Sequence, residues 1–130
     1  MIGYVTLGSD DLDRSRAFYD ALFGEVGASR LMQLESGFTL YGTGWGKPGV
    51  AVTRPYDGRG AAPGNGNMVS LVVDSRARVD RVYARALELG STDEGPPGVR
   101  GEEGDRAFYG AYFRVPDGHK FCVFRMGPAD

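Results

Sequence analysis

The chain has 130 residues, of which 42% are hydrophobic and 25% charged, and its formal net charge is −2 at pH 7. This composition fits one globular domain that buries most of the surface its unfolded form exposes. No apolar run approaches the roughly 20 residues of a membrane span, and the arginines are dispersed among acidic residues, so we expect neither a membrane nor a nucleic-acid partner. The only cysteine is Cys122, and the N-terminus shows no secretion signal. Both features predict a cytoplasmic protein.

The first part of the sequence predicts a β-α-β-β-β module. A β-prone run, Ile2 to Leu7, precedes a helix that Asp10 or Asp11 can cap and that Gly24 closes. The apolar stripe of this helix consists of Leu12, Phe18, Tyr19, Leu22 and Phe23. Glycine-containing turns then separate three short strand candidates, which are Ser29 to Leu34, Phe38 to Tyr41 and Val50 to Thr53.

The second part predicts the same module with one weak strand. A strand from Met68 to Val73 precedes a helix that Asp74 or Ser75 can cap and that Gly90 ends in a left-handed conformation. Its apolar stripe consists of Val79, Val82, Tyr83, Ala86 and Leu87. Phe108 to Val115 and Lys120 to Met126 are strands joined by the turn "PDGH". The acidic, glycine-rich segment Ser91 to Arg106 predicts a solvated, flexible loop. The alternative is a loop beside a cleft that attracts a cationic ligand and closes over it.

The two modules are copies of one another. Tyr4 matches Met68 and Tyr19 matches Tyr83, with a separation of 64 residues in both cases. The sequence therefore predicts an α+β fold made by internal duplication, as one domain of residues 1–130. Within it we expect a module at 1–54, a connector at 55–67 and a module at 68–130.

Side-chain alternation along the strands separates a helix-facing set from a pocket-facing set. Val5, Leu7, Val69, Leu71, Val73, Phe121 and Val123 are expected to face the helices. The other face carries aromatic, soft and hydroxyl side chains, a mixture that suits a ligand pocket; its residues are Tyr4, Thr6, Met68, Ser70, Lys120, Cys122 and Phe124. The alternative is that this face packs against its own copy or another subunit, with methionine filling the gaps.

Three further residues are candidates for the pocket. Trp45, in the turn "GTGWGK", either stacks on a planar ligand or packs in the fold. Arg54 and Tyr56 flank the connector and are expected at the mouth of the pocket, although Arg54 has Asp57 as an alternative partner.

The segments "YVTLGSDDLDRSRAFYDALFG", "RPYDGRGAAPGNGNMVSLVV" and "YFRVPDGHKFCVFR", together with the paired modules, resemble the vicinal oxygen chelate superfamily. This group includes glyoxalases, bleomycin resistance proteins, fosfomycin-modifying enzymes and extradiol dioxygenases. The resemblance implies two curved modules that form an incomplete barrel around a cleft, often completed by a second subunit. We therefore expect a homodimer, which would also cover unpaired strand edges.

Metal-dependent members of the superfamily place a His, Gln or Glu ligand on the first and last strand of each module. The resemblance puts these positions at Tyr4, within Gly49 to Thr53, at Met68 and at Cys122, none of which has a usual ligand type. His119, the only histidine, lies in the "PDGH" turn and is expected to face solvent. Cys122 has no histidine base beside it in the pattern and is expected to be a small buried hydrophobe. The sequence thus predicts no metal and no cofactor.

Three hypotheses follow for the function. The first is a metal-independent protein that binds a small molecule and acts by sequestration, as a resistance protein does, with no catalytic residue. The second is a glyoxalase-like lyase or dioxygenase whose metal ligands are not recognisable. The third is an interaction module that uses its sheet face only for dimerisation. The missing ligand types favour binding over catalysis.

Overall fold

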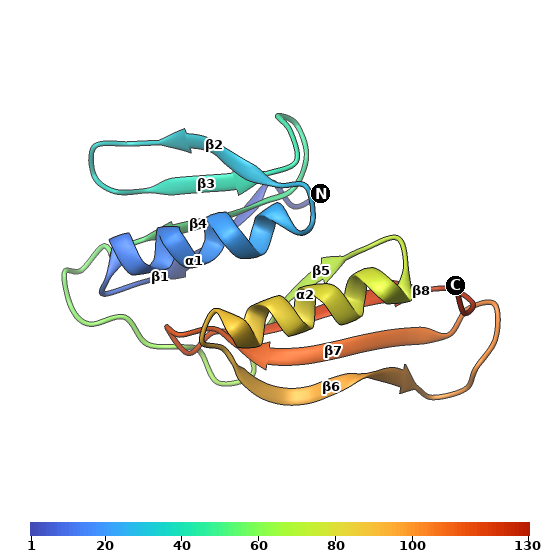
Figure 1. The fold of residues 1–130 in the computed structure, drawn as a ribbon. Helices are drawn as coiled ribbons and strands as arrows, with labels where there is room; N and C mark the ends of the chain where they lie inside the picture. Colours follow the sequence, from blue (N-terminus) through green and yellow to red (C-terminus); the bar gives the residue numbers. More distant parts are fainter. The chain divides into compact units, whose positions relative to one another are not determined.

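Each half of the chain folds into one helix and a four-stranded sheet (Figure 1). The computed structural model describes all residues, Met1–Asp130. It divides into two units, Met1–Pro63 (unit 1) and Gly64–Asp130 (unit 2). The α+β class and the paired modules are as the sequence predicts, and neither sheet forms a closed barrel.

Unit 1 contains β1 (Tyr4–Gly8), α1 (Leu12–Gly24), β2 (Ser29–Gln33), β3 (Thr39–Gly42) and β4 (Gly49–Thr53). The strand order is β1-β4-β3-β2. Strands β1 and β4 are parallel, with Tyr4 opposite Gly49, and the other neighbours are antiparallel. The first and last strands of the module therefore lie side by side.

Unit 2 repeats this arrangement with β5 (Val69–Val72), α2 (Arg76–Glu88), β6 (Thr92–Arg100), β7 (Phe108–Arg114) and β8 (Lys120–Met126). Its strand order, β5-β8-β7-β6, is equivalent to that of unit 1, and β5 and β8 are again the parallel pair. The first residues of the two helices, Leu12 and Arg76, are separated by the same 64 positions as the sequence repeat.

The starts and ends of both helices agree with the signals of the sequence. The side chains of Asp11 and Ser75 accept hydrogen bonds from the backbone N–H of Arg14 and Arg78, respectively. Gly90 is left-handed, with φ +103°, as expected. Gly24 is the last residue of α1, as expected, and the first left-handed glycine after it is Gly27 at φ +75°.

The loop predicted for Ser91 to Arg106 is wrong over most of its length. Thr92–Arg100 forms β6, which pairs antiparallel with β7. The ladder is irregular, with register shifts between Asp93 and Gly95 and between Gly95 and Gly98. The glycines and prolines of this segment disfavour a regular strand, and they lie where the ladder is irregular.

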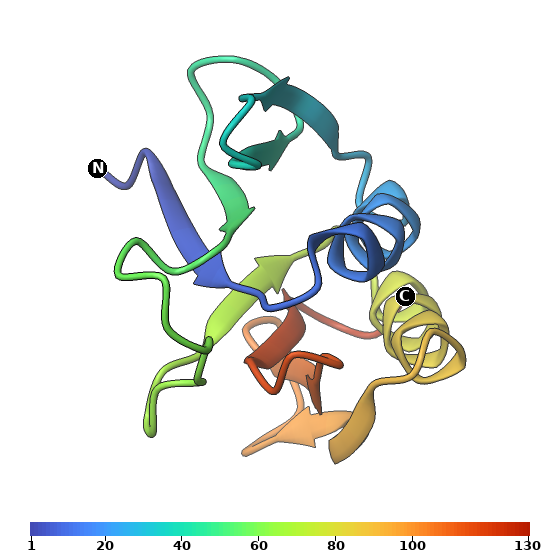
Figure 2. The same cartoon turned by 90° about the vertical axis from the view of Figure 1, so that its left-hand side faces the viewer.

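One face of each sheet packs on its helix, as seen end-on in Figure 2. In unit 1, Tyr19, Leu22 and Phe23 of α1 pack with Tyr41 and Val52, all at 2% exposure or less. The rings of Tyr19 and Phe23 are stacked at 4.9 Å, and Phe23 meets Tyr41 edge-on at 5.3 Å.

The core of unit 2 is aliphatic on the helix side and aromatic on the sheet side. Val79, Val82 and Ala86 of α2 and Phe121 and Val123 of β8 are fully buried. Phe121 and Val123 therefore occupy the core, as their strand parity predicts.

An ion pair and a phenol fix α1 against β2 and β3. The Arg30 guanidinium donates to both carboxylate oxygens of Asp20 at 2.8 Å, and the Tyr41 hydroxyl donates to the same carboxylate at 2.9 Å. Burial, and then the hydrogen bond to Asp20, raise the pKa of Tyr41. This contact holds the Tyr41 side chain on the side of β3 that faces α1. The side chains next to it along β3 therefore point away from α1. No helix in the structure is long and apolar enough to cross a membrane.

Candidate functional site

A hollow of roughly 900 Å³ lies in unit 1 on the sheet face opposite α1. Its floor comes from β1, β2 and β4, and its rim comes from the β2–β3 turn and the connector that follows β4. The lining residues are Tyr4, Thr6, Gly8, Met32, Leu34, Ser36, Phe38, Thr53, Arg54, Pro55, Tyr56, Asp57, Gly60, Ala61 and Ala62. This volume is within the range of small-molecule sites.

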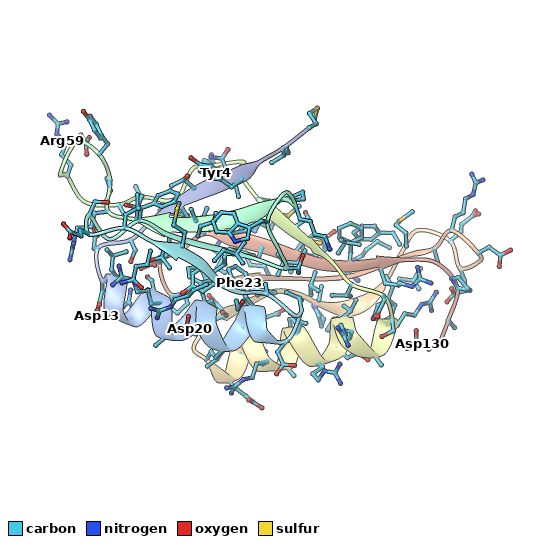
Figure 3. All side chains as sticks on the ribbon, turned by 90° about the horizontal axis from the view of Figure 1, so that it is seen from above. Tyr4, Asp13, Asp20, Phe23, Arg59 and Asp130 are labelled. Carbon is cyan, nitrogen blue, oxygen red and sulfur yellow. The ribbon has the colours of Figure 1, made fainter.

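Three aromatic side chains line the hollow, Tyr4, Phe38 and Tyr56. Tyr4 and Phe38 meet edge-on at 5.7 Å, and Tyr4 is 54% exposed. Figure 3 shows Tyr4 on the other side of the sheet from Asp20 and Phe23 of α1. Tyr56 is fully exposed at the rim. These rings offer stacking surface that no core residue covers.

The polar groups of the hollow are sparse. Arg54 lines the hollow and forms no ion pair with Asp57, its alternative partner in the sequence. The Asp57 carboxylate instead accepts a hydrogen bond from the backbone N–H of Arg59 at 2.9 Å. Thr6 and Ser36 add hydroxyl groups. The hollow thus combines aromatic surface with one free guanidinium and a few hydrogen-bonding groups.

Of the ten predicted pocket residues, this hollow contains Tyr4, Thr6, Arg54 and Tyr56. Trp45 lies between β3 and β4, is 69% exposed and does not line the hollow. Sequence reasoning missed Phe38, Met32 and Ser36. Met32 and Leu34 are two residues apart, so on a strand their side chains point to the same face. This alternation was the signal that could have placed both on the open face.

The other five predicted residues belong to unit 2. Ser70 on β5 pairs with Cys122 on β8, and Cys122 pairs with Tyr112 on β7. Lys120 and Phe124 flank Cys122 at the same parity on β8, and Met68 precedes β5 and is 45% exposed. The structure therefore brings four of them together on the sheet face opposite α2, and Met68 lies at the start of β5.

Cys122 lies beneath its neighbours rather than open to a ligand. It is 1% exposed, and Ser70 and Tyr112 lie opposite it on the two neighbouring strands. Burial raises the pKa of the Cys122 thiol, and the two hydroxyls oppose that effect only in part. A protonated, buried thiol is a poor nucleophile, so the expectation of a small buried residue holds.

His119 differs from the expectation of a solvent-facing turn residue. It is 9% exposed and counts among the buried polar residues. Its carbonyl oxygen accepts a hydrogen bond from Val115 at 3.0 Å, which closes the β7–β8 turn.

The residues do not fit the metal ion of the metal-dependent members. At the implied ligand positions the structure has the phenol of Tyr4, the strand Gly49–Thr53 with no carboxylate or imidazole, the thioether of Met68 and the buried thiol of Cys122. No group of three or more His, Cys, Asp or Glu side chains in the chain could hold a metal ion. Zinc and ferrous sites require such converging donors.

Comparison with known proteins agrees with the fold. The sequence of residues 4–124 matches the protein family described as the glyoxalase-like domain. The structure of a glyoxalase/bleomycin resistance protein from Albidiferax ferrireducens T118 is 32% identical, with 96% of this chain and 98% of that chain covered and a TM-score of 0.84.

Two more distant structures show the same fold. A lactoylglutathione lyase from Agrobacterium tumefaciens is 23% identical, with 96% of this chain and 92% of that chain covered and a TM-score of 0.67. The fosfomycin resistance protein FosX from Mesorhizobium loti is 22% identical, with 96% and 90% covered and a TM-score of 0.66. None of the curated proteins matches the chain. On the match over residues 4–124, together with the duplicated modules, this chain belongs to the glyoxalase-like domain family of the vicinal oxygen chelate superfamily.

Proposed function

We propose that the protein binds a small organic molecule without a metal ion and acts by sequestration, as a resistance protein does. The observation that carries the proposal is the hollow of unit 1. Its aromatic lining is open, and Asp57 is the only residue in it of a usual metal-ligand type. A relative described as a glyoxalase/bleomycin resistance protein, 32% identical over nearly the whole chain, supports the same reading.

Binding without catalysis is consistent with the titratable groups near the open faces. A general base must reach a substrate proton and have a pKa near the working pH. Burial moves the pKa of Cys122 away from that range. The alternative, a metal-dependent lyase or dioxygenase, has no specific observation in its favour.

Metal analysis and a binding screen test the proposal together. The protein, purified without a metal-binding tag, is expected to hold no stoichiometric zinc, nickel, manganese or iron. It is expected to bind aromatic compounds with equal affinity before and after EDTA treatment, measured by calorimetry. One tightly bound metal equivalent that EDTA removes together with ligand binding would overturn the proposal and favour the lyase or dioxygenase.

Matched variants locate the binding. Tyr4→Ala and Phe38→Ala each remove one ring of the edge-on pair, and an aromatic contact contributes about 0.5–1.5 kcal/mol, so affinity is expected to fall by about 2- to 12-fold. Trp45→Ala is the control, since it removes an exposed ring outside the hollow. If Trp45→Ala weakens binding as much as Tyr4→Ala, the hollow is not the site.

We also propose that the protein is a cytoplasmic homodimer. Each sheet has two edge strands, β1 and β2 in unit 1 and β5 and β6 in unit 2. Open edges of this kind are commonly covered by another chain. A monomer at micromolar concentration in analytical ultracentrifugation would remove the dimer from the proposal.

A further inference from the structure

A continuous row of side chains crosses the sheet of unit 2 on the face opposite α2. The strand registers place Ser70 opposite Cys122, Cys122 opposite Tyr112, and Tyr112 opposite Gly95. The hydroxyls of Ser70 and Tyr112 both act to lower the pKa of the buried Cys122 thiol, against the larger effect of burial. The row thus presents two hydroxyl groups and then, at Gly95, a position without a side chain.

Arg100 fills the position that Gly95 leaves open. Its guanidinium folds back along β6 and donates to the carbonyl oxygens of Pro96 at 2.7 Å and Gly98 at 2.9 Å. A Cβ on Gly95 would lie 3.2 Å from the Arg100 guanidinium and 3.1 Å from the Tyr112 ring. The glycine and the irregular ladder of β6 therefore hold Arg100 beside Tyr112 in one orientation.

Lys120 approaches the same ring from β8. The Lys120 ammonium and the Arg100 guanidinium each lie 5.5 Å from the centre of the Tyr112 ring. Neither cation has a carboxylate within ion-pair distance, whereas neighbouring Arg114 is paired with Glu94. Two like charges around one ring repel each other, and a cation–π contact offsets this only in part.

An apolar row lies next to this cationic row. Phe124 stacks on Phe108 with 5.2 Å between ring centres and 13° between planes. Val72 pairs with Phe124 and is 70% exposed. The open face of unit 2 therefore places aromatic surface beside two unneutralised cations and two hydroxyl groups.

We propose that this face binds an aromatic oxyanion, with its anionic group held by Arg100 and Lys120 and its ring against Phe108 and Phe124. The inference rests on the proposed function and adds a second site, on unit 2, together with the chemical class of small molecule that this site takes. It assigns to Arg100 and Tyr112 a role that strand parity alone does not reveal.

Two fluorescent probes that differ by one anionic group test the inference. 8-Anilinonaphthalene-1-sulfonate carries a sulfonate, and N-phenyl-1-naphthylamine has the same rings without it. Charge-assisted hydrogen bonds are strong, so the anionic probe is expected to bind at least about tenfold more tightly to the folded protein. Raising the salt concentration is expected to reduce this preference.

Charge-neutralising variants assign the preference to residues. Lys120→Gln and Arg100→Gln are each expected to lower affinity for the anionic probe by about tenfold and to leave the neutral probe unchanged. Arg85→Gln is the control, because it makes the same change in net charge on α2, where Arg85 pairs with Glu88. Circular dichroism confirms that each variant is folded. Lys120→Glu provides a second test and is expected to reverse the preference.

The outcomes separate the inference from the proposed function. If both probes bind equally and Lys120→Gln changes neither, the inference fails and metal-independent binding stands. If the anionic probe is preferred but Arg85→Gln weakens it as much as Lys120→Gln, the preference reflects net charge and the inference again fails. If neither probe binds and the wider aromatic screen is also negative, the proposed function itself is overturned.

Discussion

Phe113 and Phe124 of unit 2 allow a direct test of which sheet face is the core. Phe113 is completely buried, with 0% accessible surface. Its ring stacks on that of buried Phe121, with 5.8 Å between the ring centres. Phe113→Ala is expected to lower the free energy of unfolding by about 3–5 kcal/mol, since it leaves a cavity in a packed core. At a urea m-value of about 2 kcal/mol/M, the unfolding midpoint falls by about 2 M.

Phe124 has the same size and a similar stacked partner, but it lies on the open face and is only partly buried. Phe124→Ala is expected to lower the free energy of unfolding by only about 1–2 kcal/mol, from partial burial and one aromatic pair. Urea unfolding followed by circular dichroism gives both values. Equal losses in the two variants would refute the reasoning, because the face assigned to ligand binding would then be packed as tightly as the core.

Three further predictions concern packing and pH. Gly49→Ala is expected to lower stability by about 1–3 kcal/mol, because a Cβ there would lie 2.6 Å from a carbonyl oxygen of β3, whereas Gly44→Ala has open space and is expected to be nearly neutral in the same urea assay. Burial raises the pKa of the Cys122 thiol, so its contribution to stability is present below the ordinary thiol pKa and is lost as the pH rises through the folded value. Folded protein should accordingly react slowly with a thiol reagent at pH 8, and fast labelling without unfolding would contradict the burial. Arg30 holds the pKa of Asp20 below its ordinary value of 3.8, so Asp20→Asn is expected to reduce stability at pH 7, with the difference from the parent shrinking as the pH falls through the lowered pKa. A thermal-unfolding difference that stays constant from pH 7 to pH 2 would exclude that linkage.

Local sequence signals predicted the regular elements closely. The helix caps at Asp11 and Ser75 and the left-handed Gly90 are short-range features, because the capping atoms lie within three residues of each other along the chain. The duplication was visible for the same reason, since it repeats these local signals with a fixed separation. Membership of the superfamily followed from these patterns and is confirmed by the family match over residues 4–124.

The errors arose where a segment depends on its neighbours. Thr92–Arg100 contains glycines and prolines that disfavour a strand, yet pairing with β7 makes it one. His119 occupies a turn sequence, which predicts exposure, yet the folded chain leaves it only 9% exposed.

The candidate site divides along the same line. The sequence by itself determined the α+β class, the duplicated modules, the strand faces and the absence of usual metal-ligand types at the implied positions, because alternation and residue identity are properties of the chain alone. Only the tertiary structure decided that Phe38 joins Tyr4 in a hollow, that Trp45 stays outside it, and that Arg100 and Lys120 meet over Tyr112. These contacts join residues on different strands, and their positions depend on sheet register and on a glycine that leaves room for a neighbouring side chain, neither of which a local pattern specifies.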